Sequence, residues 1–152
     1  MCIRDRIISL QNPPYVVMIE KALRDEGTSY HYLPPSPFSY LHPELRKTIS
    51  SAWDNTNVPL YIGASWTTDA PFRETDEMIT TCQKKGILTV EMEAAALYAL
   101  AEVKQYKIIC FAHVTNQMGQ TEGDFEKGLA QGSFTALRIL TQTATAWMGT
   151  DH

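Results

Sequence analysis

Short apolar runs of strand length alternate along this chain with longer segments whose apolar residues recur at helical spacing. The strand-like runs are Tyr15–Leu23, Val58–Trp66 and Lys107–Asn116. The segments with helical spacing are Pro43–Trp53, Thr75–Gly86, Thr89–Glu102 and Asp124–Met148. Because strands that alternate with helices are typical of α/β folds, we predict a three-layer αβα sandwich with a central mixed sheet.

The composition fits a single globular domain and excludes several classes of partner. The 152 residues are 44% hydrophobic, and 13 Lys and Arg against 17 Asp and Glu give a net charge of -4. The sequence has no basic run of the kind that binds nucleic acid, and no apolar segment of the roughly 20 residues that a membrane helix needs. Three cysteines without CxxC spacing indicate neither a disulfide framework nor a metal site. We therefore expect a soluble, cytoplasmic protein with no nucleic-acid, membrane or metal partner.

Polar side chains follow two of the predicted strands. The segment TTDAPFRET (67–75) follows the second strand, and NQMG (116–119) follows the third. Ligands of α/β proteins usually bind beyond the carboxyl ends of strands, so a site is expected at these segments. A further candidate is the start of the predicted helix Thr89–Glu102, where Glu91 and Glu93 precede three alanines. Acidic residues in a first turn also complement the helix dipole, which is the alternative interpretation of both glutamates.

Three segments occur in a fixed order: GASWTTDAPFRET (63–75), VEMEAAALYALA (90–101) and ICFAHVTN (109–116). Together they resemble the nucleoside phosphorylase family, which includes purine nucleoside phosphorylase, uridine phosphorylase and related nucleosidases. The resemblance extends from Val16 to Trp147. It implies that residues 13–152 are a partial family domain lacking its N-terminal strands, and that residues 1–12 are a leader foreign to the family.

The resemblance also implies roles for residues of the segment TTDAPFRET (67–75) and of the predicted helix start. Glu93 would bind the ribose 2′- and 3′-hydroxyls and stabilise positive charge on the sugar, while Met92 would lie against the sugar and Glu91 would line the same site. Phe72 would stack on the nucleobase, and Arg73 would bond a carbonyl oxygen of the base. Glu93 and Arg73 are therefore the predicted catalytic residues. Without the resemblance, Phe72 and Arg73 would be interpreted as a core aromatic and a solvated loop arginine.

The third segment bears on the identity of the base. Purine-cleaving members of the resembled family carry an aspartate where this sequence has Asn116, and an amide cannot deliver a proton. Asn116 is thus predicted to bind substrate without acting as an acid, which favours a pyrimidine nucleoside. His113 and Asp124 are nearby candidates for a substitute acid, although a histidine in an apolar strand is more often a hydrogen-bonded core residue.

The resemblance implies no cofactor, with phosphate as the co-substrate. The glycine loop and arginine that bind phosphate in the family have no counterpart before Pro13, so we expect little phosphorolysis by this chain alone. The segment Arg24–Tyr32 contains a glycine and hydroxyls, but its single arginine favours an ordered loop or a subunit contact. Three functions remain open: a homo-oligomeric nucleoside phosphorylase, a nucleosidase that uses water, and a non-catalytic nucleoside-binding or oligomer-forming subunit.

Overall fold

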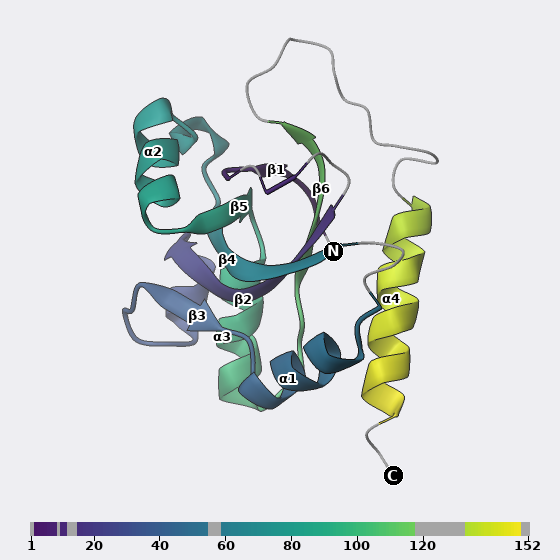
Figure 1. Cartoon of the computed structure of the whole chain (residues 1–152). Helices are drawn as coiled ribbons and strands as arrows, with labels where there is room; N and C mark the ends of the chain where they lie inside the picture. The colour runs from purple at the N-terminus through teal and green to yellow at the C-terminus, as the bar shows by residue number, and fades with distance from the viewer. Residues whose placement is uncertain (1, 9, 12–14, 55–58, 118–132, 150–152) are drawn as a thin grey trace.

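The computed structural model describes residues 2–8, 10–11, 15–54, 59–117 and 133–149 and shows a sheet flanked by helices (Figure 1). The strands are β1 (Cys2–Arg6), β2 (Tyr15–Asp25), β3 (Phe38–Tyr40), β4 (Leu60–Thr68), β5 (Ile87–Glu91) and β6 (Phe111–Gln117). The α-helices are α1 (Pro43–Ala52), α2 (Asp76–Lys84), α3 (Ala94–Lys104) and α4 (Ser133–Met148). Two 3-10 helices, η1 (Thr28–His31) and η2 (Pro71–Arg73), follow β2 and β4. The α/β class with a mixed central sheet flanked by helices is confirmed.

The sheet closes on itself. Its strand order is β3-β2-β4-β5-β1-β6, and β6 also pairs with β2. β2 is parallel to β4, and β4 is parallel to β5, whereas β2 runs antiparallel to β3 and β6. Because β2, β4 and β5 point the same way, their carboxyl ends meet at one edge of the sheet. That edge is called the carboxyl edge below.

Three strands were not expected from the sequence. β1 lies in the segment 1–12 and pairs with β5 and β6, and β3 pairs with Lys21, Ala22 and Leu23 of β2. β5 corrects the prediction of one continuous helix over Thr89–Glu102, because Thr89, Val90 and Glu91 form strand and α3 begins only at Ala94. The β-branched pair Thr89 and Val90 suits a strand, and both side chains are buried beside β4.

Helix α2 confirms its predicted boundaries. The Thr75 hydroxyl accepts the Met78 N–H at 3.3 Å, as expected for an N-cap, and Gly86 follows the helix with a φ of 70°. α2 covers one part of the sheet through a cluster that contains Trp66, Cys82 and Val90. α1, α3 and α4 lie on the other side of the sheet from α2, over a larger cluster built on β2 and β6 (Figure 1).

Helix α3 is fixed to the sheet by one buried tyrosine. Tyr98 is fully buried, donates its hydroxyl hydrogen to the Ile19 carbonyl and accepts the Cys110 N–H at 3.1 Å. Burial raises the pKa of this phenol well above its ordinary value, so the hydroxyl keeps its proton. Ala94 and Tyr98 are buried as their spacing predicted, but Leu97 on the same predicted face is 38% exposed. The buried residues Ala94, Ala95, Tyr98 and Ala99 form the face that packs on the sheet, and Leu97 is not among them.

Helix α4 packs through a face that differs in part from the one predicted by the spacing of Leu137, Leu140, Ala144 and Trp147. Leu137 and Leu140 are exposed, whereas Ile139 and Thr143 are buried. The part of the predicted helix at residues 124–132 lies outside the described residues. Within the described ranges, no helix has both the length and the apolar character needed to cross a bilayer.

Candidate functional site

The carboxyl edge brings together two of the segments that the sequence singled out. Asp25 at the end of β2 pairs with Thr68 at the end of β4, and Thr67 of β4 pairs with Glu91 at the end of β5. The 3-10 helix η2 leaves β4 from this edge, and the turn at residues 91–93 leaves β5 beside it. The predicted base segment and the predicted ribose segment therefore extend from neighbouring parallel strands.

Glu91 accepts four hydrogen bonds at this edge. It is 2% exposed, and its Oε1 accepts the hydroxyl hydrogens of Ser65, at 2.9 Å, and Thr67. Its Oε2 accepts the backbone N–H groups of Glu93 at 2.7 Å and Ala94 at 2.6 Å. Both oxygens are thus occupied inside the protein. The carboxylate supplies the acceptor that the first N–H groups of α3 need.

Glu93 occupies the N-cap position of α3 without forming a side-chain cap bond. The acceptor for the first N–H groups of α3 is instead Glu91, which is the last residue of β5. Neither glutamate lies within the helix, but the Glu91 carboxylate bonds the first N–H groups of α3, so the alternative interpretation, an acid that complements the helix dipole, holds for Glu91. Met92, between them, is 42% exposed, and Glu93 is half-buried. Thr67 also accepts the Ala95 N–H at 3.0 Å, so β4 fixes the start of α3 a second time.

Phe72 and Arg73 lie in η2 beyond the end of β4. Phe72 is 97% exposed, which excludes the core position that was its alternative interpretation. The Arg73 Nε lies 3.3 Å from Asp25 Oδ2, and the same oxygen accepts the Trp66 indole N–H at 3.0 Å. Arg73 is therefore linked through Asp25 to a buried tryptophan of β4.

A shallow pocket of about 330 Å³ lies beside Arg73 and is lined by residues of two loops. Its second arginine, Arg24, is 5% exposed and donates to Ser29, Ser36 and the carbonyls of Leu33 and Pro34. These bonds confirm that the segment Arg24–Tyr32 is an ordered loop.

Strand β6 contributes a buried histidine. His113 is 1% exposed, and neither ring nitrogen has a hydrogen-bond partner among the described residues. Burial lowers the pKa of this imidazole, which favours the neutral ring. The expectation of a hydrogen-bonded core histidine is confirmed for its burial. It is not confirmed for its hydrogen bonding among the described residues. Asn116 pairs with Asp5 of β1, but its side chain lies outside the described part, as does Asp124 entirely.

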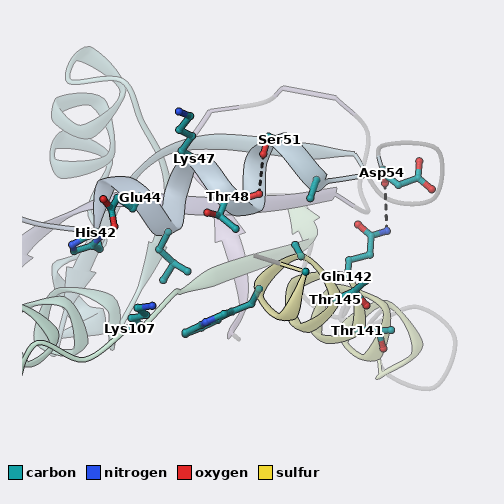
Figure 2. Close-up of a pocket in the computed structure, with 15 residues that line it drawn as sticks. His42, Glu44, Lys47, Thr48, Ser51, Asp54, Lys107, Thr141, Gln142 and Thr145 are labelled. Atoms are coloured by element: carbon teal, nitrogen blue, oxygen red, sulfur yellow. Dashed lines mark hydrogen bonds between the residues drawn. The ribbon is translucent and has the colours of Figure 1, made fainter. Parts of the chain in front are cut away.

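A larger cavity than the pocket beside Arg73 lies elsewhere, in a groove of about 850 Å³ between α1 and α4 (Figure 2). Lys107 and Trp147 both line this groove, and the Lys107 Nζ lies 6.0 Å from the centre of the Trp147 ring. Gln142 donates to the Asp54 carbonyl at 3.4 Å across the gap between α4 and the end of α1. None of the predicted site residues lines this groove.

The residues that support the site were not identified from the sequence. Ser65 and Thr67 lie two positions apart in β4, a spacing that places both hydroxyls on one face of a strand. The sequence signal that could have identified them is a pair of hydroxyl side chains in an otherwise apolar strand. Asp25 lies two positions after the apolar run Tyr15–Leu23, but nothing local indicated its contacts with Trp66 and Arg73. Among the described residues, no group of three or more His, Cys, Asp or Glu could hold a metal ion.

Comparison with known proteins gives the family of the chain. The family model of the phosphorylase superfamily matches residues 11–144. A guanosine phosphorylase from Halorubrum lacusprofundi is 31% identical over 93 residues, which are 59% of this chain and 37% of that protein.

Two solved structures share the fold. Uridine phosphorylase from Vibrio fischeri superposes with a TM-score of 0.69 at 22% identity, over 95% of this chain and 57% of that one. AMP nucleosidase from Bacteroides thetaiotaomicron superposes with a TM-score of 0.78 at 16% identity, over 99% of this chain and 62% of that one. This chain thus spans between about a third and about three fifths of the length of these relatives. The match over residues 11–144 means that the chain belongs to the phosphorylase superfamily of nucleoside phosphorylases and nucleosidases.

Proposed function

We propose that this chain provides the nucleoside-binding part of a nucleoside phosphorylase. The reaction is the phosphate-dependent cleavage of the N-glycosidic bond of a ribonucleoside, which releases the free base and ribose 1-phosphate. Phosphate is the co-substrate, and no other cofactor takes part. The names of two relatives, guanosine phosphorylase and uridine phosphorylase, support phosphorolysis as the reaction type.

The observation that carries the proposal is the bonding of Glu91. Because Glu91 supplies the acceptor for the first N–H groups of α3, Glu93 is not used to cap the helix. A turn fixed in this way presents Met92 and Glu93 at the carboxyl edge with little freedom to move. A preorganised carboxylate stabilises an oxocarbenium-like sugar more than a mobile one does, since it needs no reorganisation in the transition state. We therefore assign the ribose contact to Glu93 and Met92, and a supporting role to Glu91.

Arg73 and Phe72 complete the proposed site at the base. A guanidinium only donates hydrogen bonds, so Arg73 suits a base with a ring carbonyl oxygen. Uracil and guanine, the bases of the nucleosides in the two relatives' names, both have such an oxygen. Asn116 still favours a pyrimidine, because an amide cannot protonate a departing purine. Among nucleosides with a carbonyl-bearing base, uridine is thus our first candidate substrate.

The test is a panel of uridine, inosine, cytidine and adenosine, each incubated with the protein in the presence and absence of phosphate. Because the sequence predicts little phosphorolysis by this chain alone, we expect ribose 1-phosphate to form only slowly from uridine, only when phosphate is present, and more slowly still or not at all from cytidine and adenosine. Binding of the same nucleosides is measured in parallel by isothermal titration calorimetry, which detects the site even where turnover is slow. Release of free ribose at a rate independent of phosphate would contradict phosphorolysis.

A nucleosidase is the second candidate. The fold shared with AMP nucleosidase favours it, at a TM-score of 0.78 over 99% of this chain. A nucleosidase uses the same ribose and base contacts but takes water as its nucleophile, so free ribose is its product. Nucleoside binding without any product would indicate the third possibility, a non-catalytic nucleoside-binding subunit.

A further inference from the structure

Asp25 makes two contacts at the carboxyl edge that no sequence motif indicated. Its Oδ2 accepts the Trp66 indole N–H at 3.0 Å and lies 3.3 Å from the Arg73 Nε. The three residues come from the end of β2, the middle of β4 and η2. A single carboxylate oxygen thus connects two strands of the sheet to the loop that carries the proposed base-binding arginine.

One end of this connection is rigid, and the other is not. Trp66 is fully buried in the cluster beneath α2, so its indole N–H has a fixed position. The Asp25 side chain is 23% exposed, whereas the Arg73 side chain is 60% exposed in a short 3-10 helix. An exposed arginine has many accessible rotamers, and a fixed carboxylate at its Nε restricts them.

The other charged groups around the pocket are bonded elsewhere. Asp69 accepts the Gly27 N–H at 3.1 Å, and Glu26 accepts the Ser29 N–H at 3.0 Å. Arg24 donates to its own loop and lies over the Tyr30 ring, 4.2 Å from its centre. Within the part of the chain that the structure describes, Asp25 is therefore the acid that contacts Arg73.

We infer that Asp25 is a positioning residue for base recognition, which holds Arg73 by its Nε so that the terminal NH₂ groups point toward the base. Asp25 occupies one of the five guanidinium N–H donors, and the other four, on the terminal nitrogens, are the ones that meet a carbonyl in a fork geometry. Cytosine at C4 and adenine at C6 carry an amino group where uracil and hypoxanthine carry a carbonyl oxygen, so they present a donor to the arginine at that position. Asp25 thereby raises selectivity for bases with a carbonyl oxygen at C4 of a pyrimidine or C6 of a purine. The inference rests on the proposed function, because it assigns the base to Arg73.

The decisive variant is Asp25→Asn, which removes the charge but keeps an oxygen that accepts the Trp66 indole N–H. Affinities for two matched pairs, uridine with cytidine and inosine with adenosine, are measured by calorimetry for wild type, Asp25→Asn, Arg73→Ala and the double variant. Asp76→Asn is the control, because it removes an exposed aspartate close to Arg73 in the sequence that has no contact with it. NMR spectra of the Arg73 Nε–H and Trp66 indole N–H report the two contacts of Asp25 directly, and circular dichroism checks the fold.

We expect Asp25→Asn to weaken binding of uridine and inosine about three- to tenfold, the range for loss of one partly exposed ion pair that orients a donor. Affinity for cytidine and adenosine should change less than about twofold, so that selectivity falls. In the Arg73→Ala background, Asp25→Asn should have no further effect, because Asp25 acts through Arg73. The Arg73 Nε–H signal should shift in Asp25→Asn, while the Trp66 indole signal stays close to its wild-type position.

Three results would overturn the inference while leaving the proposed function intact: unchanged uridine affinity in Asp25→Asn, equal losses for uridine and cytidine, or a further loss in the Arg73→Ala background. If wild type binds none of the four nucleosides, the proposed function fails instead. The Arg73 Nε–H signal then decides by itself whether Asp25 holds the arginine.

Discussion

The carboxyl edge and the groove between α1 and α4 differ in size and in how their polar groups are held. The groove encloses about 850 Å³ and is lined by exposed side chains such as His42, Glu44 and Lys47 (Figure 2). The pocket at the carboxyl edge encloses only about 330 Å³. Beside that pocket, however, Glu91 forms four hydrogen bonds and Asp25 connects Trp66 with Arg73.

If the proposed function is correct, this difference teaches that fixed polar groups mark a reaction site better than cavity volume does. A catalytic site lowers a barrier only if its charged groups already have their final orientation, and buried hydrogen bonds provide that orientation. The side chains of the groove have no comparable network among the described residues, so its volume alone does not indicate a reaction. The predictions below test this distinction.

The largest effect is expected for Glu93→Ala. In a form of the enzyme with a complete phosphate site, loss of a carboxylate that contacts ribose in the transition state should lower kcat/KM for nucleoside cleavage at least about a hundredfold. Steady-state kinetics with uridine measures turnover, and calorimetry measures affinity independently of turnover. Glu102→Ala, which removes an exposed glutamate at the other end of α3, is the matched control and should leave both unchanged. Near-normal kinetics in a folded Glu93→Ala variant would remove Glu93 from the site.

The second largest effect is expected for Glu91, which supports the turn that carries Glu93. In Glu91→Gln, an amide NH₂ replaces one acceptor oxygen in a buried site where four donors converge, so at least one donor loses its partner. We expect the free energy of unfolding to fall by about 2 kcal/mol, measured by urea denaturation. Glu77→Gln removes an exposed acid from the first turn of α2 and should cost less than about 1 kcal/mol. Equal losses in both variants would mean that Glu91 acts only through the helix dipole.

A third prediction uses a buried group that lacks partners, in contrast with Glu91. Burial lowers the folded-state pKa of His113 below the unfolded value of about 6.5. The unfolded chain therefore binds more protons, and the stabilisation is full above about pH 6.5 and falls as the pH drops below it. The free energy of unfolding should therefore be lower at the acidic end of this range, and His113→Leu should reduce that difference.

Urea unfolding at about pH 7.5 and about pH 5.5 measures this dependence. The control is His42→Leu, which changes an exposed histidine in the groove and should leave the pH dependence as it is in wild type. A pH dependence that is the same in His113→Leu and wild type would show that His113 does not titrate between the two conditions.

The smallest effect is expected in the groove itself. Lys107→Ala removes the ammonium 6.0 Å from the Trp147 ring, a distance at which an exposed cation–π contact contributes little. Nucleoside affinity should stay within about twofold of wild type, because the groove takes no part in the proposed site. Calorimetry with uridine checks this. A loss comparable to that of Glu93→Ala would show that the groove, and not the carboxyl edge, binds the nucleoside.

The sequence by itself determined the features that depend on neighbouring residues. Apolar periodicity predicted β2, α1, α2 and the α/β class, and the segments 63–75, 90–101 and 109–116 predicted the family. The predicted location of Arg73 after a strand also agrees with the structure. These features depend on turns, periodicity and short motifs, which a local stretch of chain expresses fully.

Only the tertiary structure decided which groups serve the proposed site and which support it. The strand that ends at Glu91 was predicted as helix, because its buried position follows from pairing with β4 and not from its own residues. The contact between Ser65 and Glu91 spans 26 residues of sequence, and the contact between Asp25 and Trp66 spans 41. Contacts of such separation form only when the sheet brings its strands together, so no local pattern could have indicated them.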